Sequence, residues 1–401
     1  MWRSVPLTIY WFIYMGALGI FFPYYGLYLR ENARLSGTEL GLVLAVLPLV
    51  GMIAQPLWGQ VADRTGARSR TLAWLSLGSA TGYLALGAAK GFAAIAFATA
   101  VLAIFTTAVL PMTVSVSLAI LRDQGPHAFG FVRAWGTVGF FAFVVGFPWI
   151  LKSYQALHGL ILQTQKTSEP GLEIMFVVTA ILVFVSAVVA FFLPKTGIVS
   201  LRADRGDWRM LLRNSPFIRF LLFSLLAYFL QQGPMWLFPI FVRSRGGDID
   251  TVRWMWIWML IVEIPLVLSA GSGLRRIGAR GLLMIGVLAG GLRWILCALV
   301  TDLPVLHAVQ MLHGLTVVGL MLGGPLYLDV VTPERLRSTA QAMLSMVGIG
   351  IAGMISTTGA GWLLDHGGID AIYIIAGSGS LALGCLASWA LPSVEKHERA
   401  A

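Results

Sequence analysis

Three ionisable residues stand inside long apolar stretches of this 401-residue chain. Glu263 lies in the middle of the stretch 251–274, and Arg293 and His313 lie inside the next two stretches. A charged side chain at the centre of a membrane helix costs roughly 2.5–3.5 kcal/mol on insertion scales, so such residues persist where they face a cavity or a partner. We predict that Glu263, Arg293 and His313 move a coupling proton. The alternative is a structural pair of Glu263 with Arg293 that only holds two helices together.

A second group of polar and aromatic residues is suited to holding a small molecule. Arg133 offers the forked donors that pair with carboxylates or hydroxyls, and Trp135 offers a flat ring for stacking. The alternative role of Arg133 is snorkelling to the lipid headgroups. Tyr24 and Tyr25 either line the cavity or only pack, and the two roles are equal alternatives. The predicted substrate-binding set is Arg133, Trp135, Tyr24, Tyr25, Gln231 and Gln232.

The elements that must position these residues are apolar helices. The chain is 58% hydrophobic and only 11% charged, which is far from the composition of a soluble domain. A span needs about 20 apolar residues, and backbone groups in a bilayer must be satisfied inside helices. Twelve stretches meet this need: 6–29, 39–61, 71–89, 92–120, 129–151, 172–193, 214–242, 251–274, 281–300, 303–331, 337–364 and 370–391.

The distribution of basic residues predicts the orientation. With an even number of spans the two termini share one side, and the loops of that side carry most of the Lys and Arg. Both termini are therefore expected in the cytoplasm. The formal net charge of +10 is spread over short loops, which suits anionic headgroups and gives no reason to expect nucleic-acid binding. Trp254, Trp256 and Trp258 are expected to form an aromatic belt at the outer face.

An internal repeat predicts two related halves. The ten residues from Gly59 to Arg68 follow the second span, and those from Gly271 to Arg280 follow the eighth, with five of ten positions identical. Six spans separate the copies, so the repeats run parallel. The predicted fold is an all-α membrane protein with twelve transmembrane helices, in two six-helix bundles related by a pseudo-two-fold axis along the membrane normal. Residues 1–193 and 214–401 form the bundles, and 194–213 form a cytoplasmic linker.

The first copy resembles the signature loop of the major facilitator superfamily. The residues that carry the resemblance are Gly59, Asp63, Arg64, Gly66 and Arg68, followed by a further basic residue at Arg70, at the loop between the second and third spans where that family has its motif. The resemblance implies that these residues act in gating the cytoplasmic side, with Asp63 capping a neighbouring helix or pairing with an arginine across the bundle interface.

A narrower resemblance covers most of the chain. The stretches 22–25, 55–59, 130–136 and 292–294, together with Leu312-His313, are similar to those of lactose permease, nucleoside:proton symporters and phenylpropionate-type permeases. These families use the proton gradient for uptake. Ser115 and Thr316 stand where lactose permease has acidic residues, so lactose itself is not expected.

The sequence predicts a secondary active transporter that takes up a small organic solute by proton symport. An aromatic or other weak organic acid is the expected solute. A sugar or nucleoside proton symporter and a proton-driven drug efflux antiporter are the alternatives. We expect a monomer in the bacterial inner membrane that is no enzyme and has no cofactor or metal, with the proton as coupling ion. The scattered histidines and the absence of a Gly-Lys-Ser/Thr loop in the sequence agree with this expectation.

Overall fold

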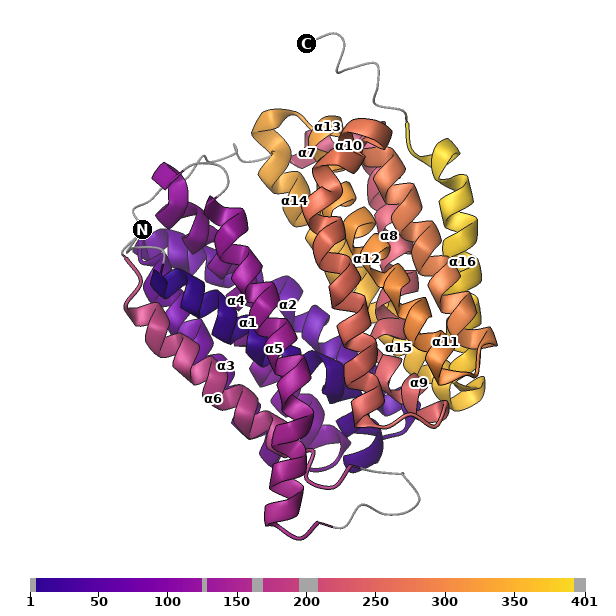
Figure 1. Cartoon of the computed structure of the whole chain (residues 1–401). Coiled ribbons are helices and arrows are strands. Elements are labelled where there is room, and N and C mark those ends of the chain that lie inside the picture. Colours follow the sequence, from indigo (N-terminus) through magenta and orange to yellow (C-terminus); the bar gives the residue numbers. More distant parts are fainter. Residues whose placement is uncertain (1–4, 125–127, 161–168, 195–207, 393–401) are drawn as a thin grey trace. The chain divides into compact units, whose positions relative to one another are not determined.

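The structure is a computed structural model that describes residues 5–124, 128–160, 169–194 and 208–392. Within these residues the regular structure is helical throughout (Figure 1). The chain separates into two compact units. Unit 1 comprises Met1–Leu201, Phe238–Ile240 and Asp248–Arg253, and unit 2 comprises Arg202–Leu237, Phe241–Gly247 and Trp254–Ala401. Most of the predicted linker falls outside the described residues.

Unit 1 is built from six long helices. They are α1 (Val5–Leu27), α2 (Gly37–Thr65), α3 (Arg68–Ala88), α4 (Phe92–Leu121), α5 (Ala128–Leu157) and α6 (Ile174–Phe191). Helix α1 packs on α5 and α6, while α4 packs between α2 and α3. Ser36 and Glu39 form a reciprocal capping box that starts α2, and Gly66 ends it with a φ of 64°.

Unit 2 has more interrupted helices. They are α7 (Trp208–Arg213), α8 (Ser215–Trp236), α9 (Phe238–Ser244), α10 (Ile249–Leu299), α11 (Leu303–Val309), α12 (His313–Val317), α13 (Gly324–Val331), α14 (Arg337–Ser345), α15 (Ala352–His366) and α16 (Gly368–Ala390). Helix α10 contains a break at Gly278, whose φ is 69°, inside the loop predicted between the eighth and ninth spans. Helix α8 packs on α15 and α16.

The predicted tenth and eleventh spans contain π-helical turns. Val318–Gly323 separates α12 from α13, and Met346–Ile351 separates α14 from α15. Such turns occur often at functional sites, because they interrupt the regular backbone ladder.

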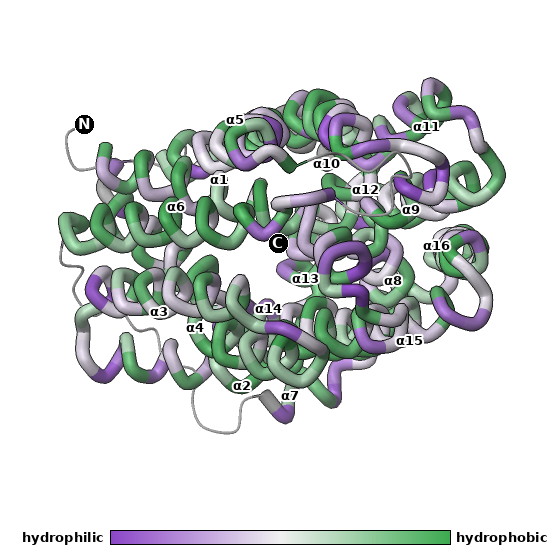
Figure 2. The backbone as a smooth tube through the Cα atoms, turned by 90° about the horizontal axis from the view of Figure 1, so that it is seen from below, coloured by the Kyte–Doolittle hydropathy of each residue, from purple (hydrophilic) through white to green (hydrophobic). Residues whose placement is uncertain are grey.

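Nine helices of the described chain are long and apolar enough to cross a membrane, or ten if the bent pair α8 and α9 is one span. Apolar residues run along most of the helices in Figure 2, while polar residues gather largely at helix ends and loops. Helix α3 and the first part of α10 are helical, as predicted, but do not meet the same criterion of length and composition. The multi-pass membrane class is therefore established, and the count of twelve stays a prediction.

Close helix contacts in unit 1 depend on glycine. A Cβ atom on Gly139 of α5 would lie 2.0 Å from the backbone oxygen of Phe12 in α1. A Cβ on Gly136 would lie 2.9 Å from the side chains of Trp11 and Met15. The two backbones therefore approach as small residues allow in membrane bundles, and van der Waals contact holds α1 against α5.

This contact predicts the effect of a single methyl group. Gly139→Ala should force α1 and α5 apart and lower the free energy of unfolding by about 1–3 kcal/mol, as overpacking does in other tight cores. The matched control is Gly146→Ala on the same helix, because a Cβ there would meet nothing within 4 Å. Thermal denaturation of the detergent-purified variants measures both. An equal melting temperature for the two variants would contradict the close contact.

Candidate functional site

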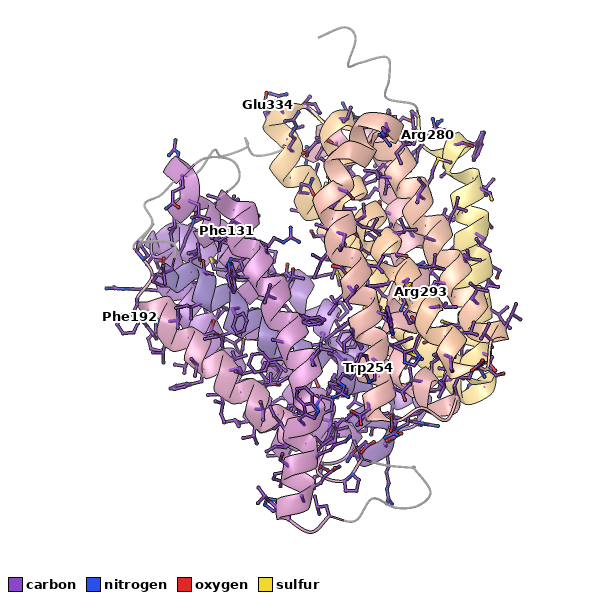
Figure 3. All side chains as sticks on the ribbon, in the orientation of Figure 1. Phe131, Phe192, Trp254, Arg280, Arg293 and Glu334 are labelled. Carbon is purple, nitrogen blue, oxygen red and sulfur yellow. The ribbon has the colours of Figure 1, made fainter. Side chains whose placement is uncertain are left out.

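The three predicted proton-coupling residues come together in unit 2. Arg293 on α10 is 1% exposed and lies among the helices of this unit (Figure 3). Its Nε donates to Oε1 of Gln310 at 2.9 Å, and its Nη1 lies 3.0 Å from Nδ1 of His313. On the other side of the imidazole, Nε2 of His313 lies 3.8 Å from a carboxylate oxygen of Glu263. His313 thus links the arginine to the glutamate.

The contact with Arg293 determines which nitrogen of His313 carries hydrogen in the neutral ring. A guanidinium only donates, so Nδ1 must accept from it. The hydrogen of the neutral imidazole then resides on Nε2, on the side of Glu263. A separation of 3.8 Å is longer than a direct hydrogen bond, so a small movement of either side chain makes or breaks this contact.

Solvent exposure increases along this chain of contacts. The side chains of His313 and Glu263 are 14% and 19% exposed, whereas Arg293 as a whole is 1% exposed. The carboxylate is therefore the member most open to exchange with the surroundings. The arginine is anchored in the protein by Gln310 and by the ring of Trp294, whose centroid is 4.1 Å from the guanidinium carbon.

The first part of α10 supplies one face of the site. Trp256, Met259 and Glu263 follow one another at spacings of three and four residues, which places them on the same face of a helix. The Trp256 ring lies edge-on to His313 with centroids 6.4 Å apart, and Met259 receives a contact from Arg293 at 3.6 Å. A Cβ on Gly314 would lie 3.0 Å from the backbone of Glu263, so this glycine lets α12 approach α10.

The prediction of an outer aromatic belt is wrong for Trp256, one of its three members. Trp254 is 48% exposed, but Trp256 is 4% exposed and packs inside unit 2 against His313. The two residues differ by 200° around the helix at 100° per residue, so they cannot both face outward. Trp256 therefore belongs to the site.

The predicted substrate contacts of Gln231 and Gln232 are occupied by the protein itself. Gln231 accepts a hydrogen bond from Nε1 of Trp294 at 2.7 Å and donates to Ser380 at 3.1 Å. Gln232 donates to the backbone oxygen of Gly348 at 2.6 Å. Both amides tie α8 to neighbouring helices of unit 2, so in this conformation part of their hydrogen-bonding capacity is used in packing.

Tyr24 and Tyr25 are fully buried in unit 1. The Tyr24 hydroxyl donates to the backbone oxygen of Val144 at 3.4 Å, and the Tyr25 hydroxyl pairs with that of Thr99 at 3.0 Å. Their rings pack against Phe147 and other aromatic side chains. Packing, which the sequence left open as an alternative to lining a cavity, is their role in this structure.

Arg133 and Trp135 are both exposed on α5, but they do not share a face. A separation of two residues rotates the side chains by about 200°, so the two point to nearly opposite sides of the helix. Among the described residues Arg133 has no hydrogen bond or ion pair. One member of the predicted pair can therefore face a bound solute, and the free guanidinium is the better candidate.

The signature loop makes a local ion pair. A carboxylate oxygen of Asp63 lies 2.8 Å from Nη2 of Arg68, in the same loop. Gly66 adopts the left-handed conformation that the turn between α2 and α3 requires. Arg64 is exposed, and Gly59 has open space where a side chain would stand. The loop is thus a tight turn held by Asp63 and Arg68.

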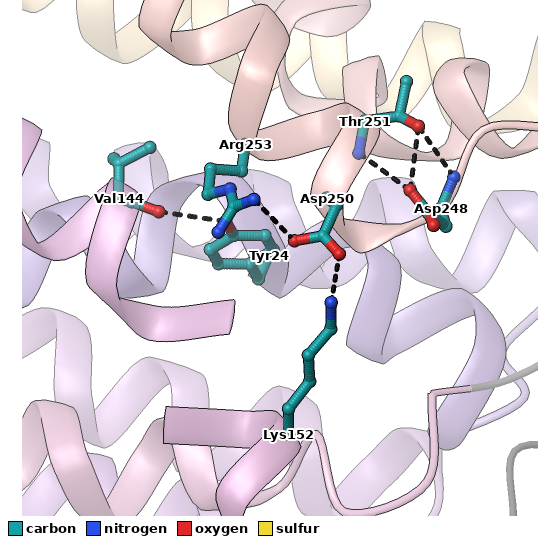
Figure 4. Close-up of polar contacts among 7 residues, drawn as sticks. All are labelled: Tyr24, Val144, Lys152, Asp248, Asp250, Thr251 and Arg253. Carbon is teal, nitrogen blue, oxygen red and sulfur yellow. Dashed lines mark hydrogen bonds and ion pairs between the residues drawn. The ribbon is translucent and has the colours of Figure 1, made fainter. Parts of the chain in front are cut away.

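A second cluster of charges lies at the other end of unit 1 (Figure 4). Lys152 of α5 pairs with one oxygen of Asp250, and Arg253 lies 3.0 Å from the other. The guanidinium of Arg253 also stacks 5.3 Å from the ring of Trp149. These contacts hold the first turn of α10 on the end of α5. Lys152 and Arg253 are therefore both paired with Asp250.

Sequence reasoning missed four residues of the site: Gln310, Trp256, Trp294 and Met259. Gln310 precedes His313 by three residues and so shares its helix face, which is a usable signal. The others are apolar or aromatic residues on apolar helices, and nothing in their type separates them from ordinary packing residues.

The pair in the signature loop generates a test of gating. Asp63→Asn should slow transport severely, because it removes the ion pair of the gating loop, and it should leave the solute affinity nearly unchanged. The variant should stay folded, since an exposed ion pair contributes at most about 1 kcal/mol to folding. Initial rates of solute exchange in proteoliposomes measure the effect. Arg68→Gln should slow transport to the same degree, because it removes the same ion pair. The variant that carries both changes should be no slower than either single variant. A normal rate for Asp63→Asn would refute the gating role.

Comparison with known proteins places this arrangement in a family. The model of the "MFS_1 like family" matches residues 4–375. The maltose permease of Geobacillus stearothermophilus is 29% identical over 93% of this chain and 90% of its own length. The probable 3-phenylpropionic acid transporter of Escherichia coli strain K12 is 24% identical over 92% and 93%. The solved nucleoside transporter NupG shares the fold, with a TM-score of 0.80 at 19% identity over 97% and 99%. The chain is a member of the MFS_1 like family and a permease of the major facilitator superfamily.

Proposed function

We propose that this permease couples the uptake of a small organic solute to the entry of a proton. The observation that carries the proposal is the contact chain from Arg293 through His313 to Glu263 inside unit 2. A carboxylate beside a histidine, half-buried on a membrane helix, is an arrangement typical of proton relays.

The chemistry of the three side chains suggests how the proton is held. When Glu263 is ionised, it attracts the Nε2 hydrogen of His313 across 3.8 Å, and a small movement lets it accept a hydrogen bond from it, while Nδ1 of the ring accepts from Arg293. When Glu263 takes up a proton at its carboxylate, this acceptor weakens and the carboxyl becomes a donor. The two states therefore favour different positions of α10 and α12, and such a difference in contacts is what biases a transporter between conformations.

The solute that we propose first is a saccharide. Arg133 offers several donors in one plane, which suits a molecule rich in hydroxyl groups, and the maltose and sucrose permeases are relatives at 29% and 21% identity. The aromatic acid expected from the sequence is the second candidate, since the same guanidinium pairs with a carboxylate and the 3-phenylpropionic acid transporter is a relative at 24%.

The proton site predicts a separation of two transport modes. Glu263→Gln mimics the permanently protonated carboxyl, so it should abolish accumulation driven by a pH gradient and still permit exchange of labelled solute across the membrane. Proteoliposomes with and without an imposed gradient measure the two modes. The control is Glu334→Gln, which alters an exposed carboxylate at the end of unit 2 (Figure 3). Full accumulation by the Glu263 variant would place the coupling proton elsewhere, with Asp329 of α13, which accepts a hydrogen bond from Gln341 at 3.3 Å, the next candidate.

The solute site predicts the result of a conservative change. Arg133→Lys keeps the charge and loses the forked geometry, so the affinity for the true solute should fall by about tenfold, the loss of a bidentate contact. Binding of maltose, sucrose, a nucleoside and 3-phenylpropionate to the purified protein identifies the solute class. Arg122→Lys, an exposed arginine at the end of α4, is the control. Unchanged affinity for the solute that binds would mean that Arg133 does not contact it, and the alternative, snorkelling to the lipid headgroups, would hold.

A further inference from the structure

Unit 1 has a groove that the transport chemistry does not use. It lies over α4 between α2 and α3 and has a volume of about 790 Å³. Its lining is Trp58, Val61 and Thr65 from α2, Ala67 from the loop, Arg70, Thr71, Trp74, Leu77, Gly78 and Thr81 from α3, and Phe105 from α4. None of these residues belongs to the site in unit 2.

The length of the groove matches one leaflet of a bilayer. From Arg70 to Thr81 helix α3 rises by roughly 17 Å at 1.5 Å per residue. Half of a hydrocarbon core of about 30 Å is close to that value. Trp74 is 56% exposed and Val61 is 43% exposed, so the groove is open along its side. An elongated molecule can therefore enter from the surrounding lipid.

The middle of the groove offers apolar surface. The Trp58 indole donates its only hydrogen to the backbone oxygen of Ile104 at 2.8 Å, and its ring packs 5.9 Å from Phe105. The Trp74 ring packs edge-on against Phe191. The hydroxyl of Thr81 donates to the backbone oxygen of Gly78 at 2.9 Å. These polar groups already have partners, so an occupant of the middle needs no hydrogen bonds and an alkyl chain suits it.

The end beside the signature loop offers a positive charge. Arg70 is exposed there, and in the described part of the chain it has no ion pair. The nearby carboxylate of Asp63 is engaged by Arg68 at 2.8 Å. The hydroxyls of Thr65 and Thr71 donate to backbone oxygens of their own helical turns. Among the residues that line the groove, the guanidinium of Arg70 is therefore the group that an anion can pair with.

We propose that the groove binds one anionic phospholipid of the leaflet on the side of the signature loop. The phosphate lies at Arg70, and one acyl chain lies along Trp74, Leu77 and Phe105. A charged head, an apolar body and a length of one leaflet are the three properties that the groove selects, and a membrane phospholipid combines them.

Native mass spectrometry of the delipidated full-length protein tests the proposal. Phosphatidylglycerol should bind in a one-to-one complex more tightly than phosphatidylcholine of the same chains. Arg70→Gln should weaken the binding of phosphatidylglycerol by roughly fivefold, which is the contribution of one basic residue at an anionic surface. It should also remove the preference for phosphatidylglycerol over phosphatidylcholine. Thr81→Trp should block the end of the groove that lies away from Arg70 and weaken the binding of both lipids. Both residues are exposed, and an unchanged melting temperature shows that the variants are folded.

Three results would overturn the proposal. An equal loss in Arg122→Gln, which removes another exposed arginine at the end of α4, would mean that binding is unspecific electrostatic attraction. Full binding by Thr81→Trp would place the acyl chain outside the groove. Displacement of the lipid by inorganic phosphate alone would mean that Arg70 holds a free anion and that the apolar walls contribute nothing.

Discussion

The buried guanidinium of Arg293 is the constraint on which much of unit 2 depends. A cation that is 1% exposed must have its donors and its charge satisfied by protein groups, because leaving them unpaired in a low-dielectric interior costs several kcal/mol. Gln310, His313 and the ring of Trp294 meet this need from α10 and from the turn between α11 and α12. The positions of these segments are therefore tied to one side chain.

The same requirement extends outward through the neighbours of Arg293. Trp294 donates to Gln231 of α8, and Gln231 in turn donates to Ser380 of α16. A change at Glu263 or His313 is thus connected by direct contacts to the packing of four helices. Polar networks of this kind are rigid when every member has its partner, and a proton that changes one acceptor into a donor alters the whole network. This is a physical basis for coupling a proton to a movement of helices.

Unit 1 is held in a different way. Its α1–α5 contact is made by glycines that let backbones approach, and its buried polar groups include the hydroxyls of Tyr24 and Tyr25, each paired within the unit. Its charges lie at its two ends, in the signature loop and in the cluster of Lys152, Asp250 and Arg253. Because dispersion and close packing dominate between membrane helices, the contact of α1 with α5 needs no buried ion, and Arg133 on α5 stays exposed.

The sequence by itself determined the helical membrane class, the family and the three ionisable residues that meet in unit 2. Glu263, Arg293 and His313 were found because a charge in an apolar stretch is expensive and stands out. Only the tertiary structure decided how they are connected, with His313 touching both of the others, and that Gln310 and Trp256 complete the site. It also gave Tyr24, Tyr25, Gln231 and Gln232 hydrogen-bond partners within the protein and paired Asp63 with Arg68. The reason is that a sequence shows the type of a side chain and its depth in the membrane. The partners of a side chain depend on which helix faces lie together. A neutral or aromatic residue on an apolar helix carries no local energetic cost that would mark it.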